Sequence, residues 1–183
     1  MSAFIKLSTF LFAIAVFVLL YFSDKPILFS MLLGVLLLLV AFYDFLFFRI
    51  PNWINVLILL MGIAYNISIK QSFWTPRVSF MIAGLLFYLL SFIYYKVRNR
   101  QGLGGGDIKL FACGAVWLLP YHLPLVLLIS SFSALLYALL CSYNHAENRK
   151  KIGKIPFGPF LGIGIWCSWL FGREILNFLI YLS

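Results

Sequence analysis

The segment that decides the fold is residues 27–48, ILFSMLLGVLLLLVAFYDFLFF, which carries a single charged residue, Asp44. A helix of about 20 apolar residues is long enough to cross the hydrocarbon core of a bilayer. The segment therefore predicts a membrane-spanning helix with one acid near its end. Arg49, Ile50 and Pro51 follow it, and the proline predicts that the helix stops there.

Working outward, charges, prolines and polar clusters divide the chain into seven apolar segments: 7–22, 27–48, 53–69, 78–95, 108–119, 123–143 and 157–182. The fifth segment is short, and Gly172, Arg173 and Glu174 interrupt the seventh, so six to eight spans are compatible with the sequence. We expect an all-α, polytopic transmembrane helix bundle of about seven spans.

The composition excludes a water-soluble protein. Of the 183 residues, 64% are hydrophobic and only 10% are charged, and the mean hydropathy is +1.04. A soluble domain needs a polar exterior that this chain cannot supply. The loops left between the spans are short, so we expect residues 1–183 to form a single integral membrane domain. Residues 1–26 would add an N-terminal span, because residues 20–24, LYFSD, offer no signal-peptide cleavage site.

The net charge of +9 is interpreted as a topology signal, and no nucleic-acid partner is expected. With seven spans, nine basic residues fall on the side of the amino terminus and four on the other side. Basic loops stay in the cytoplasm, so the amino terminus is predicted to be cytoplasmic. A cluster of basic residues on that side is expected to contact anionic membrane lipid: Arg149, Lys150, Lys151 and Lys154.

Two of the five acidic residues lie where an acid is not expected, because they lie within or beside apolar segments. Asp24, Glu147 and Glu174 lie in loops or beside basic residues, whereas Asp44 and Asp107 lie at the ends of apolar segments. The second span ends, and the fifth begins, on the same predicted side of the membrane. The two carboxylates are therefore expected at similar depth, where acids are costly and usually functional.

Two simpler interpretations stay open for these acids. Asp107 follows a glycine run and could be a helix N-cap. Asp44 could pair with Arg49 near the interface.

If the two carboxylates share a site, they hold one proton between them, because both cannot ionise cheaply. One acid can then take a proton from water while the other donates a proton to a scissile carbonyl, as in aspartic peptidases. This chemistry needs no metal and no cofactor. The cysteines, Cys113, Cys141 and Cys167, form no C-x-x-C pair and are interpreted as small core residues, and His122 and His145 as solvated loop residues.

The glycines before Asp107 are expected to form an active-site loop. Gly104, Gly105 and Gly106 can adopt positive φ and allow a substrate backbone to approach closely. A flexible linker before a helix would show the same pattern, so the run alone is weak support.

The sequence Gly104-Gly105-Gly106-Asp107, continued by Ile108 and Lys109, fits G-x-G-D and resembles the type IV prepilin peptidases. Asp44 followed by the turn at Pro51 and Asn52 is similar to the first catalytic aspartate and the I-P-N turn of that family. The segment with Pro156, Gly158 and Pro159 is similar to the one before its last spans. The resemblance covers residue 27 to about 182, so residues 27–183 are expected to form a peptidase-like core.

The resemblance implies that Asp44 and Asp107 are catalytic and that the short basic leader of pilin-like or flagellin-like precursors is cleaved. Cleavage would occur at the cytoplasmic face of a prokaryotic inner membrane. The chain lacks the paired C-x-x-C motifs of the longer, methylating enzymes. It is therefore similar to the short form in tight-adherence pilus and archaeal preflagellin systems, with peptidase activity only.

Other functions remain compatible with the pattern. Tyr43-Asp44 with G-x-G-D also resembles presenilin-like intramembrane proteases, although the Pro-Ala-Leu motif expected there is absent. A proton-coupled carrier or an inactive assembly subunit could also hold two intramembrane acids. The sequence does not indicate the oligomeric state or how the basic leader is recognised.

Overall fold

The computed structural model describes residues 25–70, 72, 74–99, 104–145 and 155–182. All regular structure in this part of the chain is helical, which confirms the predicted all-α class. The elements are α2 (Ile27–Phe47), α3 (Asn52–Ser68), α4 (Trp74–Arg98), α5 (Gly105–Ala115), the 3-10 turn η1 (Pro120–His122), α6 (Leu123–His145) and α7 (Gly158–Leu182).

The helices coincide with six of the seven predicted segments, and the remaining segment, 7–22, lies outside the described residues. Within the described residues, three helical stretches are long and apolar enough to cross a membrane: Ile27–Phe47, Trp74–Arg98 and Pro120–Ser142. The chain is therefore an integral membrane protein. The number of spans and the side of the amino terminus stay predictions.

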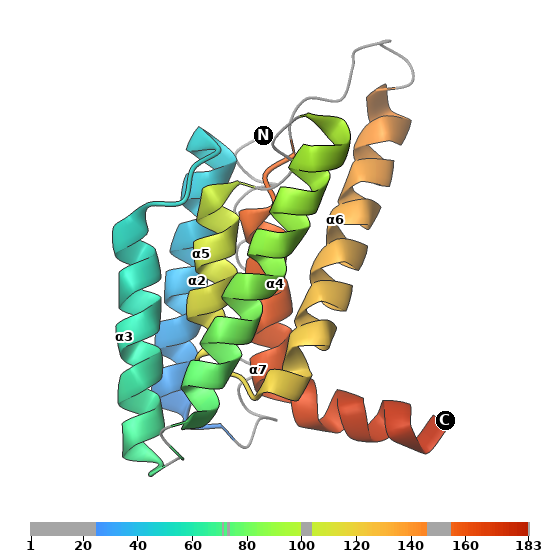
Figure 1. Cartoon of the computed structure of the whole chain (residues 1–183). Helices are drawn as coiled ribbons and strands as arrows, with labels where there is room; N and C mark the ends of the chain where they lie inside the picture. Colours follow the sequence, from blue (N-terminus) through green and yellow to red (C-terminus); the bar gives the residue numbers. More distant parts are fainter. Residues whose placement is uncertain (1–24, 71, 73, 100–103, 146–154, 183) are drawn as a thin grey trace, which may run out of the picture.

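The predicted interruption of the last segment is not a break in the helix. α7 runs as one helix from Gly158 to Leu182, through Gly172. Figure 1 shows that its C-terminal part turns away from the bundle. The fifth segment, predicted at 108–119, is shifted toward the N-terminus: α5 begins at Gly105 and ends at Ala115, and Pro120 then starts the 3-10 turn.

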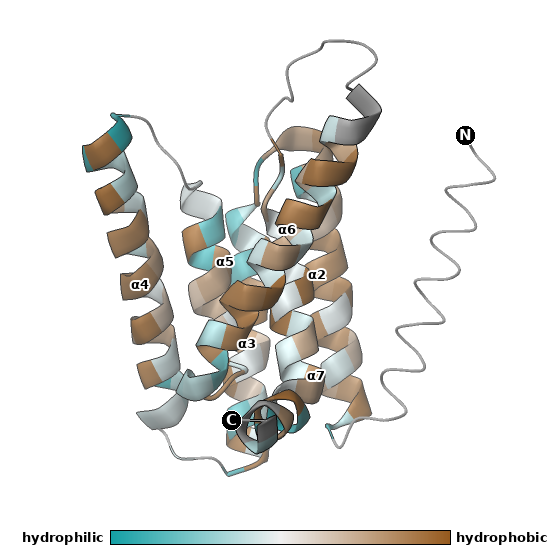
Figure 2. Ribbon diagram, turned by 90° about the vertical axis from the view of Figure 1, so that its right-hand side faces the viewer, coloured by the Kyte–Doolittle hydropathy of each residue, from teal (hydrophilic) through white to brown (hydrophobic). Residues whose placement is uncertain are grey.

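The bundle is built around α5 and α7. α7 packs against α2 and α6, and α5 packs against α3, α4 and α7. Every residue of α5 from Leu110 to Ala115 is buried, so this short helix lies inside the bundle. α4, in contrast, buries only Ser79, Ala83 and Phe87. Figure 2 shows hydrophobic residues along its length, as expected of a helix that faces lipid.

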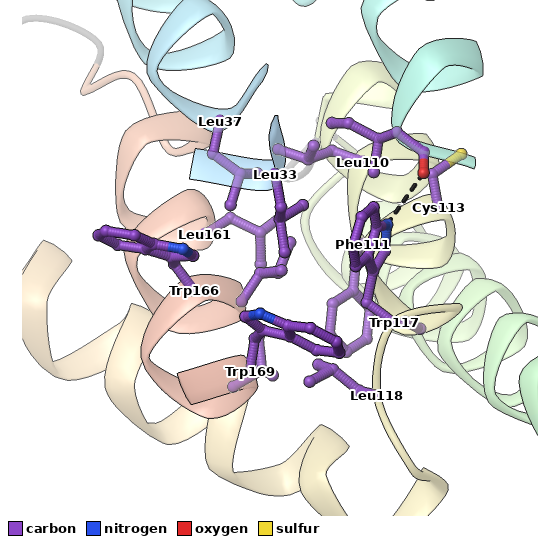
Figure 3. Close-up of a cluster of buried hydrophobic side chains, with 14 of the residues drawn as sticks. Leu33, Leu37, Leu110, Phe111, Cys113, Trp117, Leu118, Leu161, Trp166 and Trp169 are labelled. Atoms are coloured by element: carbon purple, nitrogen blue, oxygen red, sulfur yellow. Dashed lines mark hydrogen bonds between the residues drawn. The ribbon is translucent and has the colours of Figure 1, made fainter. Parts of the chain in front are cut away.

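Trp117 and Trp169 belong to a cluster of buried hydrophobic side chains in the bundle (Figure 3). Trp117 stacks on Tyr65, with ring centroids 5.8 Å apart, and its indole Nε1 donates to the Ile58 carbonyl at 2.9 Å. Trp169 contacts both rings edge-on and donates to the Ser30 hydroxyl at 3.0 Å. These contacts join α2, α3 and α7 to the segment after α5.

Polar side chains complete the end of α5, where backbone carbonyls have no helical partner. The Asn66 amide donates to the Val116 carbonyl at 3.0 Å, and the Ser79 hydroxyl donates to the Leu118 carbonyl at 2.8 Å. Because unpaired carbonyls are costly inside an apolar bundle, these bonds let α5 stop within the protein interior.

Candidate active site

Both aspartates lie at the same end of the bundle. Asp44 is in the last turn of α2, and Asp107 is in the first turn of α5. Figure 1 shows that the C-terminal end of α2 meets the N-terminal ends of α5 and α7 there. The two carboxylates are close enough for their charges to interact. The two acids, predicted at similar depth, therefore lie at the same end of the fold.

Asp44 is buried, with 6% of its surface exposed. Its Oδ2 accepts a hydrogen bond of 2.8 Å from the backbone N–H of Gly158, the first residue of α7. Arg49 is exposed, and the structure places this amide, not the guanidinium, against the acid. The interpretation of Asp44 as the partner of Arg49 is therefore wrong. The first turn of α7 stabilises the carboxylate instead, as helix N-termini do for anions.

Asp107 is half-buried and is the third residue of α5, after the N-cap Gly104. The N-cap interpretation of Asp107 is therefore wrong. Its carboxylate accepts from the backbone N–H of Gly104, as an acid at the third helical position of a capping box does. The same side chain thus fixes the start of α5 and lies within electrostatic reach of Asp44.

The glycines before Asp107 do not adopt positive φ, so that expectation is wrong. Gly104 is extended, with φ −69° and ψ 139°, and Gly105 and Gly106 belong to the first turn of α5. What two of these positions require is the absence of a side chain. A Cβ on Gly104 would lie 3.0 Å from Asp107 Oδ2, and one on Gly106 would lie 3.1 Å from Ile50 Cβ, whereas one on Gly105 would contact nothing within 4 Å.

Three other predicted motif residues, Pro51, Asn52 and Lys109, lie at the end of the bundle that holds the two acids. Pro51 is the N-cap of α3, and the next residue, Asn52, accepts a hydrogen bond of 3.0 Å from Lys109 Nζ at the surface. This bond links the first turns of α3 and α5.

The segment that leads into α7 is buried at Pro156, Gly158 and Pro159. A proline in the first turn of a helix loses no intrahelical hydrogen bond, so Pro159 suits the start of α7. The burial of these residues places the Gly158 amide beside Asp44.

Sequence reasoning missed Ile50, whose side chain lies against both Gly106 and Gly158. Its only signal was an apolar residue between Arg49 and Pro51, in a turn where exposure is the usual expectation.

The burial of His122, at the other end of α5, differs from the prediction. His122 is 7% exposed, and neither ring nitrogen has a hydrogen-bond partner among the described residues, so it is not a solvated loop residue. It is buried because Gly172 of α7 leaves room for the ring: a Cβ there would lie 2.7 Å from His122 Cδ2. His145 ends α6. Among the described residues, no group of three His, Cys, Asp or Glu side chains could hold a metal ion.

The cysteines are free thiols. Cys113 is buried in α5, as a small core residue, whereas Cys141 and Cys167 are only partly buried.

A cavity of about 410 Å³ lies between α3 and α4, lined by residues such as Leu59, Asn66 and Phe80, and it includes neither aspartate. The acids therefore do not belong to this cavity.

An apolar helix bundle with two interacting carboxylates at one end has the arrangement of a membrane protein of the aspartic peptidase class. The type IV leader peptidase family matches residues 31–139, a range that contains both Asp44 and Asp107. Because this match covers more than half of the chain, the protein belongs to the type IV leader peptidase family.

Three relatives are each named prepilin leader peptidase/N-methyltransferase. The chain is 30% identical to that of Legionella pneumophila over 155 residues, which are 84% of this chain and 53% of the relative. It is 29% identical to that of Aeromonas salmonicida over 84% of this chain and 52% of the relative. It is also 29% identical to that of Dichelobacter nodosus over 67% of this chain and 39% of the relative.

The chain thus spans about two fifths to a half of the length of these curated relatives. No solved structure matches the chain.

Proposed function

We propose that this protein is a membrane aspartic endopeptidase that removes the basic leader of type IV pilin-like or flagellin-like precursors. The observation that carries the proposal is the meeting of Asp44 and Asp107 at one end of the bundle, from helices far apart in the sequence. Both acids lie within the part of the chain that matches the family.

In the proposed reaction, the two carboxylates share one proton. The ionised acid takes a proton from water, whose oxygen attacks the scissile carbonyl carbon. The protonated acid donates its proton to the carbonyl oxygen. The tetrahedral intermediate then collapses, the C–N bond breaks, and the leaving amine takes a proton from the site. No metal or cofactor takes part in this scheme.

The proposed location follows from the basic residues. Arg49, Lys96, Arg98 and Lys109 lie at the end of the bundle that holds the acids. The loops predicted on this side add five more basic residues, Arg100, Arg149, Lys150, Lys151 and Lys154. If basic loops stay inside, this end faces the cytoplasm of a prokaryote and the multi-pass chain lies in its inner membrane. Residues 1–183 would form one membrane domain, in which 27–183 are the peptidase core and 1–26 are an additional span.

The test is co-expression with a candidate precursor and a blot for the size shift. We expect Asp44→Asn and Asp107→Asn each to lower cleavage by at least about a hundredfold, because neither amide can exchange the proton. Removal of a buried acid should leave the amount of protein in the membrane unchanged or higher. A variant that cleaves at close to the parental rate would disprove the role of its acid.

The same assay separates the alternatives. A carrier or an assembly subunit yields no shortened precursor in any background, and a presenilin-like protease cuts within the apolar helix and not before it.

We also propose that the 183-residue chain cleaves without methylating, because its three cysteines form no C-x-x-C motif. A mass spectrum of the mature amino terminus, from a host without other such enzymes, would reveal an added methyl group.

A further inference from the structure

Ile50 lies between two backbone segments that are distant in the sequence. It belongs to the turn that joins α2 and α3, and it is partly buried. A Cβ built on Gly106 of α5 would lie 3.1 Å from Ile50 Cβ, and one built on Gly158 of α7 would lie 3.1 Å from Ile50 Cδ1. Both distances are tighter than ordinary van der Waals contact, so the Ile50 side chain fills the space that a side chain on either glycine would need.

Each of these glycines adjoins one of the two acids. Gly106 directly precedes Asp107, and the Gly158 amide donates to Asp44 Oδ2 at 2.8 Å. The segment that carries Asp107 and the amide that holds Asp44 are therefore separated by the same isoleucine side chain.

We propose that Ile50 is a positioning residue that sets the separation of the Asp44 and Asp107 carboxylates. The proposal rests on the proposed peptidase function. A β-branched side chain is stiff at χ1, and protein interiors are close-packed, so such a side chain resists displacement by its neighbours. A displacement of 1 Å at a catalytic group can lower a rate by about a hundredfold.

The second link between this turn and α5 is weaker. The hydrogen bond between Lys109 and Asn52 is exposed, and exposed polar pairs contribute little to rigidity. We therefore expect Ile50, and not Lys109, to control the spacing of the acids.

The test compares the full-length parent, Ile50→Val and Ile50→Ala in membranes, with purified precursor. Valine removes Cδ1, the atom nearest Gly158, and alanine removes the side chain beyond Cβ. We expect kcat to fall about threefold to tenfold for valine and about tenfold to hundredfold for alanine, with KM nearly unchanged. The two limbs of the pH–rate profile should also move relative to each other, because the coupling of two carboxylates depends on their distance.

Ile58→Val is the matched control, since Ile58 is fully buried in α3 and packs near Trp117, away from the acids. It loses the same methyl group and should lower stability without moving the pH–rate profile. The proposal is wrong if Ile50→Val retains the parental kcat per molecule and the parental profile, or if it lowers only the amount of folded protein. A parent that cleaves no precursor, under conditions where a known relative does, would overturn the proposed function itself.

Discussion

At the scale of single residues, the most informative contact is the one between Asp44 and Gly158. An ionisable group in an apolar bundle must be stabilised by neighbours, and here a backbone amide does so. Only glycine allows this approach, since a Cβ at position 158 would lie 2.8 Å from Asp44 Oδ2 and 3.2 Å from its Cγ. The carboxylate is short and already hydrogen-bonded, so it could yield only by leaving its position.

We therefore predict that Gly158→Ala lowers kcat for precursor cleavage by about tenfold to a hundredfold, because it displaces a proposed catalytic carboxylate. The matched control is Gly105→Ala, at which a new Cβ meets nothing within 4 Å. Alanine also has the higher helix propensity, so this control should cleave within about twofold of the parent. Cleavage rates per molecule in membranes would decide the matter, and equal effects of the two alanines would contradict the role of Gly158.

At the scale of secondary-structure elements, α3 carries two buried asparagines in opposite situations. The Asn66 amide donates to the Gly62 carbonyl at 2.7 Å and to the Val116 carbonyl at 3.0 Å. Asn55, one turn from the start of the helix, is 3% exposed, and neither of its amide atoms has a hydrogen-bond partner in the part of the chain that the structure describes. The first asparagine joins α3 to the segment after α5, whereas the second carries an uncompensated desolvation cost.

This contrast predicts opposite signs for the same substitution. Asn66→Leu should lower the free energy of unfolding by about 0.6–2 kcal/mol, the range of interhelical hydrogen bonds in membranes, because it leaves the Val116 carbonyl unpaired. Asn55→Leu should leave that free energy unchanged or raise it. Reversible unfolding in detergent micelles measures both. A stable Asn66→Leu variant together with a destabilised Asn55→Leu variant would refute this account of α3.

At the scale of the whole molecule, the distribution of charge predicts how the bundle lies in the membrane. The end that holds the two acids also presents Arg49, Lys96, Arg98 and Lys109. The opposite end presents Lys25 before α2, Lys70 and Arg77 at the connection between α3 and α4, and Arg173 in α7. The sequence adds further basic residues to the loops predicted on the side of the acids: Arg100, Arg149, Lys150, Lys151 and Lys154. With these loops counted, the positive-inside rule predicts that the acids face the cytoplasm, where precursor leaders are expected.

We predict that a cysteine at Val97 is labelled by a membrane-impermeant thiol reagent only from the cytoplasm, and a cysteine at Ser72 only from outside. Both positions are exposed, and they lie at opposite ends of α4. The experiment needs a background without the native cysteines and does not depend on cleavage. The reverse labelling pattern would place the acids on the wrong side for a leader peptidase.

The sequence by itself determined the all-α class, the approximate helix ranges and the expectation that Asp44 and Asp107 meet. These features could be predicted because they depend on local properties. Hydropathy over about 20 residues indicates a helix in the membrane, and the alternation of spans brings every second connection to the same side. The resemblance of G-x-G-D to the prepilin peptidases added the assignment of chemistry to those two acids.

Only the tertiary structure decided what holds each acid in place. The donor to Asp44 comes from a residue 114 positions away, and Ile50 contacts two helices that local patterns cannot relate to it. Likewise, His122 is buried because α7 passes it at Gly172, which no property of either residue alone indicates. Hydropathy and motif spacing report what a segment prefers, whereas these contacts depend on which helices pack together and in which register.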